Sequence, residues 1–237
     1  MKEWMIGLLF PRRCPVCDQI VIPKGELICP ECRKQLSYVS GPVCMRCGKE
    51  LLEPDGEYCM GCKKHRRTFE KGAALLNYNE VSAHSMVQIK YKNKREYLDF
   101  YSAEIVHRLG RQIAFMRADA LIPVPVHPSR KRIRGYNQAE ELAKRLSNHT
   151  GIPVFAELLV RSKKTMPQKE LTPALRLKNL EQAFSVKEGA VWKELESVIL
   201  VDDIYTTGST IEACARALKR AGIGHIFFVS ICIGGDR

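Results

Sequence analysis

The sequence predicts an α/β fold in which a doubly wound, mainly parallel sheet is preceded by a small cysteine-rich module. Two observations support this prediction. Segments with strand and helix patterns alternate from residue 71 onward, and eight of the ten cysteines stand in C-x-x-C pairs before residue 63. With 237 residues the chain can form one sizeable core and a small additional unit. We therefore expect two domains, residues 1–65 and residues 66–237.

The cysteine pairs form a repeat. The pattern C-x2-C-x11-C-x2-C occurs twice, and the second copy follows the first at an offset of 30 residues. Four thiolates at this spacing converge on a tetrahedral Zn²⁺, so we expect a double zinc ribbon with about two structural Zn²⁺ ions. We favour one ion per repeat, with a cross-braced pairing between the repeats as the alternative. The expected ligands are Cys14, Cys17, Cys29, Cys32, Cys44, Cys47, Cys59 and Cys62.

The remaining elements follow from hydrophobic periodicity and from the residues that end each segment. Strands are expected at residues 71–78, 118–126, 154–160, 197–201 and 225–233, and helices at residues 83–89, 97–115, 137–148, 175–183 and 211–221. In an alternating fold of this kind, ligands bind at the carboxyl ends of the strands. Cys214 and Cys232 fall on a helix and a strand of this set, where we expect buried core residues.

Residues 1–10 are apolar, but the segment is short and has no small-residue cleavage site. We expect it to pack on the body of the protein rather than to act as a signal peptide, which predicts a cytoplasmic protein and disfavours a disulfide framework. No apolar run approaches the roughly 20 residues that a membrane span needs. The sequence therefore excludes a membrane-spanning function.

The net charge of +12 is unevenly distributed, since residues 66–150 contain 16 Lys and Arg against 8 Asp and Glu. This asymmetry suggests a polyanionic partner, nucleic acid or a polyphosphate, and solubility is an equally favoured explanation. One basic cluster interleaves cations with Tyr91 and Tyr97, a mixture that suits phosphate contacts and base stacking on a single strand. We expect this cluster to lie outside the ligand pocket; a solvated charge run at a helix end is the alternative. Its cations are Lys90, Lys92, Lys94 and Arg95.

Residues 198–210 carry the most specific functional signal. Four apolar residues predict a buried strand, two acidic residues end it, and a short loop rich in hydroxyl groups leads into a helix. Such a loop places backbone N–H groups at a helix N-terminus and favours an anion, while Asp202 and Asp203 suit sugar hydroxyls or Mg²⁺. A 5-phosphoribosyl site is the prediction, and a capped helix without a ligand is the alternative. The expected phosphate-binding residues are Thr206, Thr207, Gly208, Ser209 and Thr210.

Two further loops are expected to meet this one. Residues 127–138 follow a strand and contain four cations within five residues, which suits a pyrophosphate; Arg130, Lys131 and Arg134 are the candidates. Residues 161–169 are polar and long, as expected of a mobile lid.

The acid-pair segment resembles the phosphoribosyl pyrophosphate (PRPP) signature of type I phosphoribosyltransferases. The whole chain resembles the ComF/GntX family. The segments that carry this resemblance are Phe10-Pro11-x-x-Cys14-x-x-Cys17, Ile89-Lys90-Tyr91-Lys92, Pro123-Val-Pro125, Arg134-Gly135-Tyr136-Asn137-Gln138, Arg161-x3-Thr165-x2-Gln168-x2-Leu171-x4-Arg176-x2-Asn179, and Ala183-Phe184.

The family resemblance implies a double zinc ribbon joined to a type I phosphoribosyltransferase-like domain. It also implies a role in late steps of natural DNA uptake, with single-stranded DNA and competence proteins such as a DNA-uptake helicase as partners. The resemblance supplies no reaction. Two functions therefore stay open: a nucleic-acid-binding adaptor with a PRPP pocket, and an active phosphoribosyltransferase of nucleotide salvage or metabolism.

Overall fold

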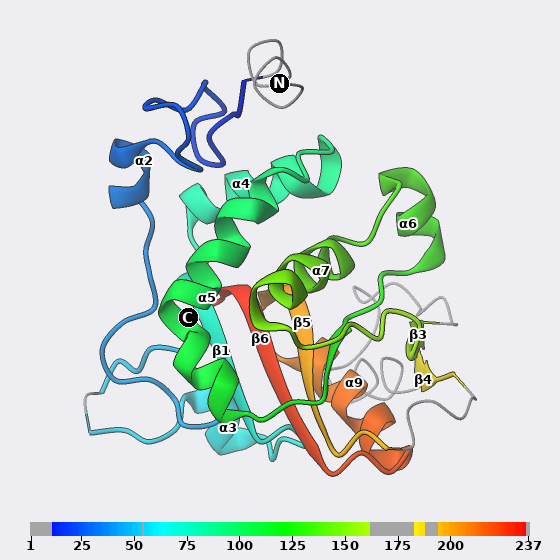
Figure 1. The fold of residues 1–237 in the computed structure, drawn as a ribbon. Helices are drawn as coiled ribbons and strands as arrows, with labels where there is room; N and C mark the ends of the chain where they lie inside the picture. Colours follow the sequence, from blue (N-terminus) through cyan, green and yellow to red (C-terminus); the bar gives the residue numbers. More distant parts are fainter. Residues whose placement is uncertain (1–10, 54, 162–182, 188–193, 236–237) are drawn as a thin grey trace.

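The computed structural model describes residues 11–53, 55–161, 183–187 and 194–235. Its centre is a four-stranded sheet in the order β1-β6-β5-β2, in which every neighbouring pair is parallel (Figure 1). The strands are β1 (Lys71–Asn77), β2 (Ala120–Pro123), β5 (Ser197–Tyr205) and β6 (His225–Ile233). Every residue of β5 except Ile204 is buried, as expected of a central strand covered on both faces.

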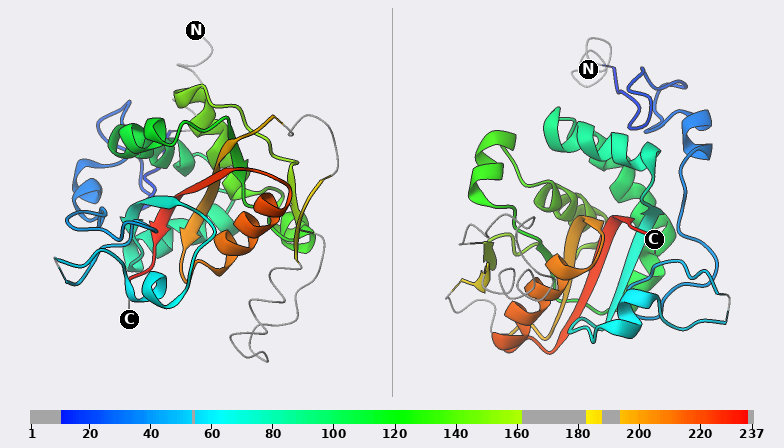
Figure 2. Two further views of the ribbon diagram at one scale, coloured as in Figure 1. Left: turned by 90° about the horizontal axis from the view of Figure 1, so that it is seen from below. Right: turned by 180° about the vertical axis from the view of Figure 1, so that it is seen from behind.

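Helices cover both faces of the sheet. On one side lie α4 (Glu80–Tyr91), α5 (Tyr97–Phe115) and α7 (Gln138–Thr150), and on the other lies α9 (Ser209–Arg220), as Figures 1 and 2 show. The doubly wound α/β prediction is therefore confirmed.

Side-chain caps begin the two helices that reach toward the acid pair. The Asn79 side chain accepts the Ser82 N–H at the start of α4, and Asn137 accepts the Ala139 N–H at the start of α7. These caps fix where each helix starts, and so they determine which side chains the helices present to β5.

Two of the expected elements differ. Residues 154–160 do not form a strand of the main sheet: Val154 makes one isolated parallel bridge to Leu121, and the chain then enters the short strand β3 (Leu159–Arg161). β3 pairs antiparallel with β4 (Phe184–Val186) in a separate two-stranded ribbon. The cationic stretch expected to be a loop contains a helix, α6 (Pro128–Arg134), because Pro128 and the Ser129 N–H bonded to His127 begin a turn.

The expected helix at 175–183, apart from Ala183, lies outside the described residues, as do the expected lid beyond Arg161 and the segment 1–10. Among the helices that the structure describes, none is long and apolar enough to cross a membrane.

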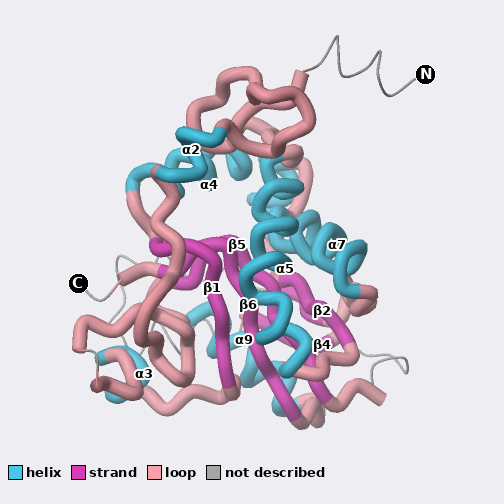
Figure 3. Tube along the Cα trace, turned by 60° about the vertical axis from the view of Figure 1, so that its left-hand side comes forward, coloured by secondary structure: helices cyan, strands magenta, loops and turns pink. Residues whose placement is uncertain are grey.

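The first cysteine-rich repeat lies above α4 and α5, and the second lies beside β1 (Figure 3). They include the short helices α2 (Pro30–Lys34) and α3 (Met60–Lys64). Residues 37–39, between the repeats, run along the outer edge of β1: the Val39 N–H donates to Leu75 O at 3.0 Å and the Asn77 N–H donates to Ser37 O at 2.7 Å. This contact pairs an edge that would otherwise be open.

The hydrophobic cores also cross the expected boundary at residue 65. Cys14 and Ile28 of the first repeat belong to the core around α5, and Cys47 and Cys59 of the second belong to the core between the sheet and α9. The two units expected from the sequence therefore share their cores.

Candidate functional site

Each cysteine repeat forms one compact cluster. In each set of four, the Sγ atoms all lie within 4.8 Å of one another, and Cys47 Sγ lies 3.6 Å from Cys59 Sγ. A tetrahedral Zn²⁺ with Zn–S bonds of about 2.3 Å requires comparable sulfur separations. All ten cysteines have free thiols. The residues fit two structural zinc ions. The structure brings together the four cysteines of each repeat, which is the sequential pairing and not the cross-braced one. The first cluster is Cys14, Cys17, Cys29 and Cys32, and the second cluster is Cys44, Cys47, Cys59 and Cys62.

The acid pair lies within β5 rather than after it, because the strand continues to Tyr205. Both carboxyl groups are buried, with 8% exposure for Asp202 and 5% for Asp203. Asp203 Oδ1 accepts a hydrogen bond from Gln138 Nε2 of α7 at 2.9 Å, and the Lys90 ammonium at the end of α4 forms an ion pair with the same carboxylate. Asp202 Oδ1 accepts the Asp203 N–H at 2.9 Å.

The two carboxyl groups have different protonation preferences. Burial, together with the neighbouring Asp203 charge, raises the pKa of Asp202 well above its usual range. Burial acts in the same direction on Asp203, but the Lys90 ammonium and the Gln138 amide outweigh it, so the pKa of Asp203 is lowered. Negative charge therefore concentrates on Asp203, where Lys90 compensates it.

Residues 206–210 join the carboxyl end of β5 to the first turn of α9, and we call them the phosphate loop after the ligand that the sequence predicts for them. Gly208 occupies the left-handed region, with φ of +77°, and a Cβ there would lie 2.3 Å from the Tyr205 hydroxyl oxygen. Only glycine fits, because any side chain would collide with that ring. Thr207 Oγ1 and Ser209 Oγ lie 2.9 Å apart at the start of the helix. The loop thus offers hydroxyl groups and helix N–H groups together.

The three cations expected to hold pyrophosphate take different positions on or at the end of α6. Arg134 reaches the acid pair indirectly: it donates to Gln138 Oε1, and Gln138 in turn donates to Asp203. Lys131 turns toward α7, with its Nζ 3.7 Å from Glu140 Oε2. Arg130 is exposed and lies within electrostatic range of Arg161.

The basic cluster at the end of α4 divides in the structure. The expectation that Lys90 lies outside the pocket is wrong, because its ammonium pairs with the buried Asp203. Lys94 Nζ lies 3.4 Å from Asp18 Oδ1, and the Arg95 guanidinium lies 4.1 Å from the centre of the Tyr136 ring. Lys92 remains exposed.

The aromatic residues of that cluster divide in the same way. Tyr91 is 69% exposed, whereas Tyr97 is 1% exposed and donates its hydroxyl hydrogen to Asp18. Tyr97 is therefore not available for stacking on a base.

Sequence reasoning missed the partners that complete this site. Gln138 belongs to one of the recognised motifs, but the local spacing does not show that α7 aims it at Asp203. Arg161 lies within electrostatic range of Asp202, and its buried Nε has no hydrogen-bond partner among the residues that the structure describes. Tyr205, directly under the phosphate loop, has the sequence pattern of an ordinary core residue. The contacts of Gln138 and Arg161 have no local sequence signal, since each joins elements that are distant along the chain.

Comparison with known proteins agrees with this organisation. The double zinc ribbon domain family matches residues 5–63. Competence protein F of Haemophilus influenzae is 38% identical over 108 residues, which cover 46% of this chain and 47% of that protein. Competence protein ComFC of Bacillus subtilis (strain 168) is 26% identical over 152 residues, 63% of this chain and 58% of that protein. The chain is thus similar to ComF competence proteins over 46% and 63% of its length, and to the double zinc ribbon family at its cysteine-rich end.

Other ComF-related proteins carry a different name. The DNA utilization protein YhgH of Escherichia coli O157:H7 is 29% identical over 149 residues, 61% of this chain and 64% of that protein. Each of these alignments with named relatives spans less than two thirds of the relative's own length. A purine phosphoribosyltransferase from Pyrococcus horikoshii Ot3 aligns with a TM-score of 0.35 and 16% identity over 56% of this chain and 82% of that chain, a likeness too distant to support a function.

Proposed function

We propose that this ComF-like chain binds PRPP, or a related 5-phosphoribose ligand with Mg²⁺, and acts on the cytoplasmic side in the handling of single-stranded DNA during natural transformation. The observation that supports the ligand best is the continuity of β5 and α9, which places a buried, charge-compensated acid pair next to a glycine-dependent anion loop. The loop supplies the hydrogen-bond donors that a phosphate group needs, and a carboxylate supplies the acceptor that a ribose diol needs.

Each part of the site has a separate role in this proposal. The phosphate loop binds the 5-phosphate, and Asp202 with Asp203 accepts hydrogen bonds from the ribose hydroxyls. Arg134, held by Gln138, and the exposed Arg130 and Lys131 supply positive charge for the pyrophosphate. Mg²⁺ prefers oxygen ligands, and because Lys90 already neutralises Asp203, the ligand's own phosphates would supply most of them.

If a nucleophile is bound beside C1′, these residues act by positioning and by charge stabilisation. The bond between C1′ and the pyrophosphate oxygen breaks, the pyrophosphate takes the electron pair, and the nucleophile forms the new bond to C1′. An active phosphoribosyltransferase of nucleotide salvage is therefore the second candidate function. Release of pyrophosphate from PRPP with any of a panel of bases and amines would favour the enzyme, and PRPP binding without release would favour a ligand sensor.

Calorimetric titration of PRPP with MgCl₂ tests the site. The double variant Asp202→Asn, Asp203→Asn is expected to lose most of the binding heat, because in each residue an amide NH₂ group, which cannot accept a hydrogen bond, replaces a carboxyl oxygen. Glu31→Gln is the matched control, since the Glu31 side chain is 79% exposed on the first repeat and also pairs with a lysine. An unchanged isotherm in the double variant would overturn the assignment.

The role in DNA handling rests on the relatives that are named as competence and DNA utilization proteins. The surface we propose for the strand is revised by the structure. Lys92 and Tyr91 are exposed at the end of α4, and Arg130, Lys131 and Arg132 are exposed on α6. The Arg134 guanidinium lies 5.4 Å from the centre of the Tyr91 ring and so connects these two groups. Phosphate contacts and base stacking are thus available on one continuous surface. Other competence proteins, including a DNA-uptake helicase, are the proposed protein partners.

Filter binding of single-stranded DNA at several salt concentrations tests this surface. The triple variant Arg130→Ala, Lys131→Ala, Arg132→Ala is expected to bind DNA with a weaker dependence on salt. The slope of the logarithm of the binding constant against the logarithm of the salt concentration should become shallower by roughly 0.7 for each phosphate that is no longer neutralised. Arg220→Ala, which removes an exposed cation at the far end of α9, is the control. Equal slopes for the triple variant and the unmodified chain would exclude α6 from the DNA contact.

A further inference from the structure

The second cysteine cluster packs into the same core as the residues that support the phosphate loop. Cys44 and Cys47 are fully buried and belong to one hydrophobic cluster with Phe69, Tyr205 and Phe228. The Gly72 N–H donates to Arg46 O at 2.8 Å, so the turn between the first two cysteines of this cluster is joined to β1. The cluster is therefore continuous with the sheet.

Tyr205 connects this core to the loop. Its ring stacks on Phe228 with 4.6 Å between ring centres, and it meets Phe69 edge-on at 6.3 Å. The backbone of Gly208 lies directly on the Tyr205 hydroxyl, where a Cβ would be 2.3 Å away. The Tyr205 ring therefore fixes how closely the phosphate loop can pack on the core.

Arg67 and Thr68 make a second connection, a few residues after Cys62. The Arg67 guanidinium donates to Thr207 O of the loop at 2.9 Å. The same group lies 3.8 Å from the position that a Cβ would take on Gly61, between two of the clustered cysteines. Thr68 donates through its N–H and its hydroxyl to the buried Glu212 in the first turn of α9. The loop and the start of its helix are thus both fastened to the chain that leaves the second cluster.

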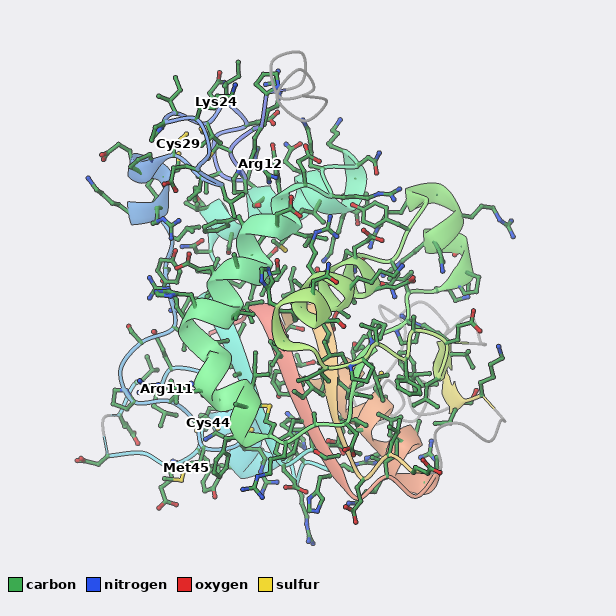
Figure 4. All side chains as sticks on the ribbon, viewed as in Figure 1. Arg12, Lys24, Cys29, Cys44, Met45 and Arg111 are labelled. Atoms are coloured by element: carbon green, nitrogen blue, oxygen red, sulfur yellow. The ribbon has the colours of Figure 1, made fainter. Side chains whose placement is uncertain are left out.

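The first cluster makes different connections. Its repeat contacts α5 through the hydrogen bond of Tyr97 with Asp18 and through the ion pair of Arg33 with Glu104. Figure 4 places Cys29 of the first cluster and Cys44 of the second at opposite ends of the protein. The chain therefore contains two similar cysteine clusters. The second lies in the core under the phosphate loop, and the first, which contacts α5 instead, serves as a control for the loss of a zinc ion elsewhere.

We propose that the second cysteine cluster positions the phosphate loop through Tyr205 and Arg67, so that binding of a 5-phosphoribosyl ligand depends on zinc in this cluster and not in the first. This inference rests on the proposed function for its ligand. Zinc binding supplies much of the folding energy of such small units. Without it, the segment 44–62 no longer holds Tyr205 and Arg67 in place, and the loop loses the arrangement that anion binding requires. Both are positioning residues, because they act through the loop.

Paired cysteine variants of the full chain test the inference. Cys62→Ser and Cys17→Ser should each lower the zinc content from about two ions to about one. Cys62→Ser is expected to weaken PRPP binding at least about tenfold, because a misplaced binding group loses most of its contribution. Cys17→Ser should leave PRPP binding unchanged. Equal loss of affinity in the two variants, or retained affinity in Cys62→Ser, would overturn the inference.

Two variants that retain every cysteine keep the test decisive if Cys62→Ser does not fold. Arg67→Met and Tyr205→Phe should keep about two zinc ions and still bind PRPP more weakly. Arg67→Met removes the hydrogen bond to Thr207 O and should weaken binding by about fivefold, and Tyr205→Phe removes the hydroxyl group on which Gly208 lies. Normal affinity in both would refute the positioning role.

Hydrogen exchange of the amides at residues 206–212 provides a readout that needs no ligand. Faster exchange in Cys62→Ser than in Cys17→Ser supports the coupling even if the unmodified chain does not bind PRPP. In that case the proposed function fails while this structural connection stands, and identical exchange in the two variants would reject the connection itself.

Discussion

Gly208→Ala is the most direct perturbation of the phosphate loop, and its cost follows from two separate features of the structure. Gly208 has φ of +77°, and the left-handed region costs a residue with a Cβ about 1–2 kcal/mol. The new methyl group would also lie 2.3 Å from the Tyr205 hydroxyl oxygen and 2.7 Å from Cζ of the same ring. Overpacking of a closed core typically costs about 1–3 kcal/mol more. We expect a total loss of about 2–5 kcal/mol in the free energy of unfolding.

Gly151→Ala separates these two contributions. Gly151 ends α7 with φ of +75°, but apart from its chain neighbours no atom of the described residues lies within 4 Å of the position that a methyl group would take there. This variant should therefore lose only the conformational part, about 1–2 kcal/mol. Urea denaturation followed by circular dichroism measures both variants, and similar m-values would show that the comparison concerns the folded state. If Gly208→Ala is no more destabilising than Gly151→Ala, the close packing of the loop on Tyr205 is refuted.

Three further predictions concern the rest of the molecule. Gly72→Ala should strongly destabilise the fold, because its Cβ would lie 1.9 Å from a phenylalanine ring, whereas Gly110→Ala, in open space within α5, should gain up to about 1 kcal/mol in the same denaturation assay. Glu104→Gln should cost about 1–2 kcal/mol at pH 7, since it removes a buried carboxylate shared by the partly exposed Arg33 and Arg108. Burial raises the pKa of Glu104, but the two guanidiniums outweigh it, so the overall pKa is lowered. The stability that Glu104 contributes is therefore present above the unfolded pKa of about 4.3 and is lost as the pH falls through the folded pKa. At that lower pH the free energies of unfolding of the variant and the unmodified chain should become equal. Removal of zinc by a chelator should lower the thermal midpoint of the whole chain, because both cysteine clusters share core with the α/β elements; an unchanged midpoint in zinc-free protein would contradict this.

Local patterns predicted much of the fold because the forces behind them act over a few residues. The bounds expected for the helix at 97–115 and the strand at 225–233 agree with those observed, since each is an uninterrupted periodic or apolar segment. The prediction of a main-sheet strand at residues 154–160 was wrong, because a short apolar run looks the same in a large sheet and in a two-stranded ribbon. Only the strands with which it pairs distinguish the two. α6 was missed because its exposed, cationic residues have no apolar periodicity.

Those elements of the candidate site that are continuous along the chain could be predicted from the order of the residues. The cysteine spacing places four thiols within reach of one ion in each repeat, and the segment 198–210 places an acid pair near the end of one strand and a hydroxyl-rich loop before the next helix. The folded structure was needed to show that Lys90 pairs with Asp203 and that Gln138 donates to the same carboxylate. It was also needed to show that Tyr205 and Arg67 contact the loop from the core that contains the second cluster. These contacts depend on which helix covers β5 and on which repeat packs against the sheet. Such choices arise from burial summed over the whole core, which no local spacing encodes.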